Sequence, residues 1–191
     1  MIMTSETLRA LYGTWRIARG DAGGLAFFDY SIPAFWRSFF AAAIVFPAFF
    51  LLRWSDIDAA QDAFPTGRYM VVETISFVIK WVAFPLAMFH IAPMIDRTSR
   101  YIAFITIYNW SSVLQMAVYL LALLLGLLFP GLGAGGFVMI AVIAMLVYGG
   151  YITMLALSVP VLTAAAIVLF DFLLSLTITA IGIRVALGNF F

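Results

Sequence analysis

The chain has 191 residues, of which 65% are hydrophobic and 10% are charged. A soluble domain carries about 45 to 50% apolar and about 25% charged residues, so this composition excludes a water-soluble globule. The formal net charge of +1 and the lack of a long basic run exclude nucleic acid as an expected partner. Composition instead predicts the lipid bilayer as the partner.

The residues that support most catalytic and metal sites are scarce. There is no cysteine and only one histidine, and no nucleophile stands beside a base in a recognisable motif. We therefore expect no catalytic residue, no metal site and no cofactor, and we expect the protein not to be an enzyme. An intramembrane enzyme that uses Asp171 is the least favoured alternative.

We predict that residues 1–35 form a cytosolic or interfacial tail that contains an amphipathic helix. Apolar residues at helical spacing alternate with arginines in "SETLRALYGTWRIARG", namely Leu8, Leu11, Tyr12 and Trp15 against Arg9, Arg16 and Arg19. Such a helix either lies in the membrane interface or packs on the membrane domain, and the sequence does not separate the two.

Residues 36–191 predict one transmembrane domain of an all-α fold, because a membrane-spanning helix needs roughly 20 mostly apolar residues. The chain contains five such runs, at residues 33–52, 69–93, 101–129, 136–159 and 162–187. Short connections between the last three runs predict antiparallel neighbours in one helical bundle. The first run contains Pro47 between Arg37 and Arg53, so a hairpin that dips into one leaflet is its alternative.

The arginines predict the orientation of the bundle. With five spans, Arg9, Arg16, Arg19, Arg37, Arg97 and Arg100 fall on one side, whereas Arg53, Arg68 and Arg184 fall on the other. Cytoplasmic loops carry the excess of basic residues, which predicts a cytoplasmic N-terminus and a periplasmic C-terminus. The compact loops favour a bacterial inner membrane.

Ionisable residues inside the predicted spans are the best functional lead, since a charge at mid-bilayer is costly. The second span carries Glu73 and Lys80 in "ETISFVIKWVAF". Seven residues of helix separate them by about 10 Å, too far for comfortable direct contact. The counter-ion of Lys80 is therefore expected elsewhere.

The fifth span supplies that counter-ion in our prediction. In "LFDFLLSLTITAIG" the residues Asp171, Ser175, Thr179 and Gly182 follow one helix face, which predicts a stripe that faces protein. Counting from the helix ends places Lys80 and Asp171 at matching depths, so we predict an ion pair between them.

The third span contributes polar groups in "YNWSSVLQ". Asn109 joins the Lys80 cluster if this helix is buried from Tyr101 onward; otherwise Tyr108 and Trp110 are residues of the aromatic belt. The cluster of Lys80, Asp171, Glu73, Asn109, Ser175 and Thr179 is then either a structural ion pair with its surroundings or part of an ion or proton path.

The third and fifth spans, "SRYIAFITIYNWSSVLQMAVYLLALL" and "SVPVLTAAAIVLFDFLLSLTI", resemble helix starts of the Yip1-like family of small five-span membrane proteins. The likeness covers about residues 36 to 187, but the Asp-Leu-Tyr-Gly-Pro motif of eukaryotic members is missing. The resemblance implies a non-enzymatic role in membrane organisation, with a membrane protein or a second copy as partner. We expect such a structural or accessory role, with a small transporter or ion pathway as the alternative.

Overall fold

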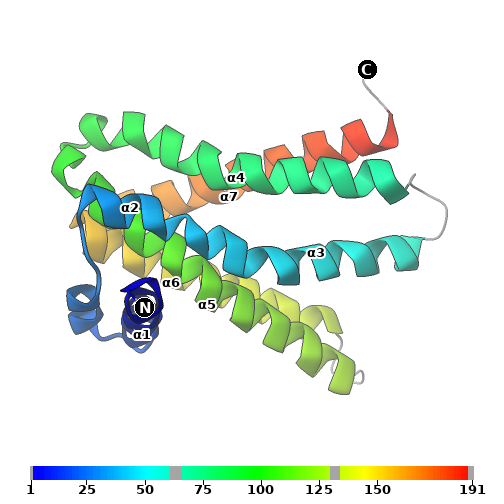
Figure 1. The fold of residues 1–191 in the computed structure, drawn as a ribbon, viewed down its shortest axis with the longest axis horizontal. Coiled ribbons are helices and arrows are strands. Elements are labelled where there is room, and N and C mark those ends of the chain that lie inside the picture. Colours follow the sequence, from blue (N-terminus) through cyan, green and yellow to red (C-terminus); the bar gives the residue numbers. More distant parts are fainter. Residues whose placement is uncertain (1, 61–65, 130–133, 189–191) are drawn as a thin grey trace.

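The computed structural model describes residues 2–60, 66–129 and 134–188, and the described chain is helical without strands (Figure 1). The α-helices are α1 (Ile2–Ala18), α2 (Ile32–Ser38), α3 (Phe40–Ala60), α4 (Thr66–Met94), α5 (Tyr101–Leu128), α6 (Ala134–Leu157) and α7 (Val161–Leu187). Two 3₁₀ helices, η1 (Ala22–Phe27) and η2 (Thr98–Arg100), connect α1 to α2 and α4 to α5.

Five helical stretches are long and apolar enough to cross a membrane, which confirms the predicted fold class. They are Ile32–Trp54, Gly67–Met94, Thr98–Leu128, Gly135–Leu157 and Val161–Leu187. Large apolar side chains remain exposed along all five, as expected for a surface that contacts lipid rather than water. The chain is an integral membrane protein.

The first span is formed by α2 and α3 together. The two helices are separated only by Phe39, and α3 runs on to the far end of the bundle (Figure 1). Pro47 lies inside α3 without ending it. The leaflet hairpin that the sequence left open is therefore not the observed structure.

The well-packed core lies at the end of the bundle that carries the N-terminal segment. Among the most buried side chains are Phe104, Ile105 and Ile107 of α5, Met88 of α4 and Leu157 of α6. From this end, α5 and α6 pack against each other and diverge from α3, α4 and α7 toward their own connection (Figure 1). Side chains of α4, α5, α6 and α7 line a cavity between these helices.

Helix α1 packs on the bundle. Ala10, Thr14 and Ile17 are buried, and the Tyr148 hydroxyl donates a 2.9 Å hydrogen bond to the carbonyl oxygen of Thr14. Figure 1 views α1 nearly end-on, so this helix lies across the spanning helices. Packing on the bundle is thus confirmed, while placement of the exposed Leu8 and Trp15 in the membrane interface stays a prediction.

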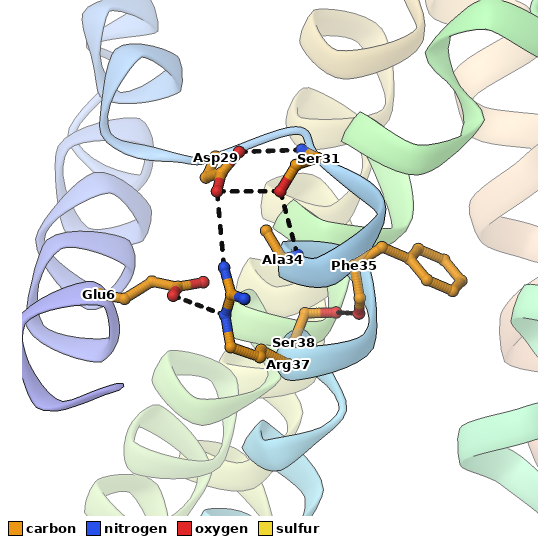
Figure 2. Close-up of polar contacts among 7 residues, drawn as sticks. All are labelled: Glu6, Asp29, Ser31, Ala34, Phe35, Arg37 and Ser38. Carbon is orange, nitrogen blue, oxygen red and sulfur yellow. Dashed lines mark hydrogen bonds and ion pairs between the residues drawn. The ribbon is translucent and has the colours of Figure 1, made fainter. Parts of the chain in front are cut away.

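Arg37 fastens α1 to the start of the first span (Figure 2). Its Nε donates to Glu6 Oε2 at 2.7 Å, and its Nη2 lies 3.5 Å from Asp29 Oδ2. The Asp29 carboxylate also accepts hydrogen bonds from the backbone N–H and the hydroxyl of Ser31, and that hydroxyl caps α2 by accepting from the N–H of Ala34. One arginine thereby joins α1, the connecting loop and α2.

This contact is expected to weaken in acid. Hydrogen bonds from Ser31, followed by the charge of Arg37, hold the pKa of Asp29 below its ordinary value of 3.8. A carboxyl whose pKa is lowered by folding stabilises the folded state above its unfolded pKa, and this contribution is lost as the pH falls through the folded pKa. A nitroxide at Leu8→Cys, the only cysteine in the chain, should therefore gain mobility below a pH of about 3.8.

The control is Asp29→Asn, which keeps the shape of the side chain but removes its charge. In this variant the nitroxide should already be more mobile at neutral pH, and its mobility should change less on acidification. Identical mobility profiles for the two proteins would contradict the assignment to Asp29.

Candidate intramembrane polar site

A cavity of about 360 Å³ lies where α6 and α7 meet α4 and α5. Most of its wall is apolar, but it gathers the polar side chains of Lys80, Tyr108, Gln115, Thr153, Asp171 and Ser175. Ligand sites are usually concave, mostly apolar and furnished with a few polar groups, and this cavity fits that description. It is the strongest candidate for a functional site among the described residues.

Asp171 is held by a tyrosine. Its Oδ2 accepts a 2.7 Å hydrogen bond from the hydroxyl of Tyr108 on α5, a length typical of a strong bond to a carboxylate. Asp171 lies one turn from Ser175 on the same face of α7, and both line the cavity. The predicted stripe therefore does face protein.

Lys80 is held by a threonine. Its ammonium group donates a 2.7 Å hydrogen bond to Thr179 Oγ1, and the Thr179 hydroxyl donates in turn to the carbonyl oxygen of Ser175 at 2.9 Å. The ammonium group has further donors that this one bond does not use, and Lys80 lines the cavity.

The predicted ion pair between Lys80 and Asp171 is wrong. Within the described part of the chain, neither residue makes an ion pair; Lys80 bonds to Thr179 and Asp171 to Tyr108. Thr179 and Asp171 are eight residues apart on α7, or roughly 12 Å along its axis. The close approach of Gly182 to Ser76 sets this register between α7 and α4, and counting residues from the helix ends misses it.

A second cavity of about 260 Å³ adjoins the first on the side of α3. The two share Lys80, Tyr108, Gln115 and Met145 in their walls. Ser112 and Tyr119 add hydroxyl groups to the second cavity. Polar interior space thus extends on both sides of Lys80 and Tyr108.

Glu73 lies apart from both cavities. Its side chain is only 4% exposed, and its Oε2 is 4.0 Å from Nε of Arg53 on α3. The guanidinium of Arg53 in turn lies 5.6 Å from the centroid of the Phe49 ring. The structure therefore gives Glu73 a partner toward the end of the bundle opposite α1, one turn beyond Ser76.

Asn109 is buried but belongs to a different contact. Its Nδ2 donates a 2.8 Å hydrogen bond to Ser38 Oγ, at the junction of α2 and α3. Tyr108 precedes it on α5 and points about 100° away around the helix, into the cavities. Of the sequence-predicted cluster, the structure brings together Lys80, Asp171, Ser175 and Thr179, and it separates Glu73 and Asn109 from them.

Tyr108 is the residue that sequence reasoning missed. We treated it only as a belt aromatic, although Tyr108, Ser112 and Gln115 recur at spacings of four and three and so share one helix face. All three line the second cavity. Helical periodicity read from Tyr108 instead of Asn109 would have identified this face.

No family model matches the chain, and no curated protein or solved structure matches it significantly. The resemblance to the Yip1-like family stays a prediction.

Proposed function

We propose that this integral membrane protein provides a proton or small-ion pathway through its polar interior. One observation supports this proposal most strongly: Lys80 and Asp171 both face a cavity and do not pair with each other. A charge inside a bilayer is costly, and an uncompensated one is usually retained where it serves transport or contacts water. Two such groups in one cavity favour transport over a structural ion pair.

The ionisable groups also extend along the membrane normal. Asp171, Lys80 and the Glu73–Arg53 pair follow one another along α7 and α4 over roughly 20 Å, given a rise of 1.5 Å per residue. The hydrocarbon core is about 30 Å thick. The hydroxyls of Tyr108, Ser175 and Thr179 lie near Asp171 and Lys80, as a relay through bound water would need.

The proposed role is non-enzymatic. Ser175 lines the cavity with Lys80 and Asp171, but Lys80 donates to Thr179 and Asp171 accepts from Tyr108. A serine nucleophile needs a base within hydrogen-bond reach, and the described residues of this cavity do not form such a pair with Ser175. Binding and passage therefore explain the arrangement better than covalent chemistry.

Proton flux into liposomes tests the proposal. The purified protein is reconstituted in vesicles that contain a pH-sensitive dye, and a potassium diffusion potential drives protons inward. Wild-type protein should exceed protein-free vesicles, while Lys80→Met and Asp171→Asn should each lower the excess flux at least about tenfold. The matched control is His90→Gln, since His90 is exposed and outside the cavities.

Two results would overturn the pathway. One is wild-type flux equal to that of empty vesicles, and the other is equal flux in all the folded variants.

The second candidate is a structural or accessory role through contacts with partner helices or a second copy. Large apolar side chains of both α6 and α7 are exposed, among them Met139, Ile140, Leu162 and Leu173, which leaves wide faces for such contacts. The resemblance to the Yip1-like family implies the same role. Stoichiometric subunits that co-purify from native membranes at endogenous level would favour this candidate.

We also propose a bacterial inner membrane with the N-terminus in the cytoplasm. The end of the bundle near α1 carries Arg19, Arg37, Arg97 and Arg100, and the positive-inside rule places such an end in the cytoplasm. Alkylation of a cysteine at Leu8 in intact and in opened cells would test this orientation.

A further inference from the structure

The outer surface of α6 and α7 carries an apolar groove of about 630 Å³. Small residues create it, because Gly150 of α6 and Ala164 and Ala165 of α7 leave space between the two helices. A side-chain carbon added at Gly150 would meet no atom within 4 Å. Tyr151 brings the only polar side-chain group among the described residues of its wall.

The groove covers about one leaflet. Along α7 it runs from Val161 to Phe172, which is 11 residues or roughly 16 Å. Half of a hydrocarbon core of about 30 Å is about 15 Å. A partner transmembrane helix would need a seam along the whole of α7, whereas one acyl chain of a phospholipid needs only this length.

Two arginines bond to backbone near the end of the groove at Val161, and a third lies beside Gly20 in the chain. Nε and Nη2 of Arg97 donate to the carbonyl oxygen of Ser158, in the turn that precedes Val161, at 3.3 and 3.2 Å. Across the groove, the Tyr151 hydroxyl donates to the carbonyl oxygen of Gly20, which directly follows the exposed Arg19. Arg100 reaches the carbonyl oxygen of Ala156 on the same end of α6.

We infer that the groove binds one acyl chain of an anionic phospholipid, with its phosphate group at Arg19 and Arg97. The hydrocarbon chain fills an apolar surface one leaflet long, and the basic end of the groove complements the negative headgroup. Basic sites between transmembrane helices on the cytoplasmic side are known to hold anionic lipid headgroups. This site is separate from the proton pathway and does not depend on it.

Contact between the two sites is nevertheless direct. Leu146, Val168 and Phe172 line both the groove and the 360 Å³ cavity. The end of a bound acyl chain would therefore press on the side chains that close the cavity toward lipid.

Lipid retention in native mass spectrometry tests the inference. The protein is purified in a mild detergent and equilibrated with phosphatidylglycerol or phosphatidylcholine of the same chain length. The wild type should retain one phosphatidylglycerol in preference to phosphatidylcholine. Gly150→Leu fills the groove from its wall and should lower retention of both lipids at least about tenfold.

Two further variants separate the chain from the headgroup. Gly136→Leu makes the same change on α6 in open space outside the groove, and it should retain lipid like the wild type. Arg19→Gln removes a charge, and among the described residues the Arg19 side chain makes no hydrogen bond that this change would break. The variant should reduce the preference for phosphatidylglycerol several-fold.

Three outcomes would overturn the inference. Gly150→Leu and Gly136→Leu could retain equal amounts of lipid, or the wild type could show no preference for the anionic lipid. The third is a wild-type dimer that Gly150→Leu dissociates and the other variants do not. The last outcome would assign the groove to a second copy of the chain. The melting temperature of each variant in the same detergent shows whether it remains folded.

Discussion

Gly182→Leu is expected to destabilise the protein by about 3 kcal/mol, at the upper end of the range for overpacking a close contact. A Cβ at Gly182 would lie 2.7 Å from Ser76 Oγ and 3.6 Å from Val72 Cγ1, so a leucine forces α4 and α7 apart. The same contact sets the register that brings Lys80 to Thr179. Unfolding in detergent, followed by circular dichroism, measures the loss.

Two further variants isolate the contact. Gly135→Leu adds the same side chain to an apolar helix where nothing lies within 4 Å, and it should change stability little. Gly182→Ala should cost about 1 kcal/mol, and Ser76→Ala should remove most of that cost, because the remaining Ser76 Cβ lies at an ordinary 3.8 Å. Equal losses in Gly182→Leu and Gly135→Leu would disprove a close approach of α4 and α7 at this point.

The helices and the five spans were predictable because the bilayer permits few backbone structures. Backbone groups in lipid must be satisfied within the segment, so a run of about 20 apolar residues becomes a helix whatever its neighbours are. The α7 stripe was predictable for a related reason. Asp171, Ser175 and Thr179 repeat every four residues, and a polar face of this kind avoids lipid in any arrangement of the bundle.

The partners of the buried charges depend on information that one helix does not hold. The register of α4 relative to α7 decides whether Lys80 contacts Asp171 or Thr179. The contact of Gly182 with Ser76 fixes this register. Likewise Glu73 lies 4.0 Å from Arg53 of α3, and neither segment alone shows how far apart α3 and α4 lie. Helical periodicity gives the face of a residue, whereas its depth relative to another helix requires the packing itself.

Asn109 shows the same limit on a smaller scale. The sequence presents Tyr108 and Asn109 side by side, and each has a polar group that needs a partner in lipid. In the structure, the Asn109 side chain donates a hydrogen bond to Ser38, at the break between α2 and α3. The Tyr108 hydroxyl donates to Asp171 instead. Since the break at Phe39 is not marked by a proline or glycine, this partner of Asn109 was not predictable.

Double-mutant cycles are expected to couple Asp171 to Tyr108 and not to Lys80. Tyr108→Phe and Asp171→Leu should interact by about 1 to 1.7 kcal/mol, because the 2.7 Å bond is the one found for the carboxylate among the described residues. Hydrogen bonds between transmembrane helices reach at most about 1.7 kcal/mol in such cycles, and bonds to charged groups are among the stronger ones. Reversible unfolding in detergent micelles supplies the four free energies of each cycle.

The cycle of Lys80→Met with Asp171→Leu serves as the comparison. Lys80 bonds to Thr179, which lies about 12 Å from Asp171 along α7, and the two charged residues share no hydrogen-bond partner, so their effects should add within about 0.5 kcal/mol. A direct ion pair would give the opposite pattern, with the double variant recovering most of the loss caused by Lys80→Met alone. Such recovery would indicate a direct ion pair between Lys80 and Asp171 and would contradict the main observation behind the proposed pathway. Two charges that neutralise each other need neither water nor an ion between them.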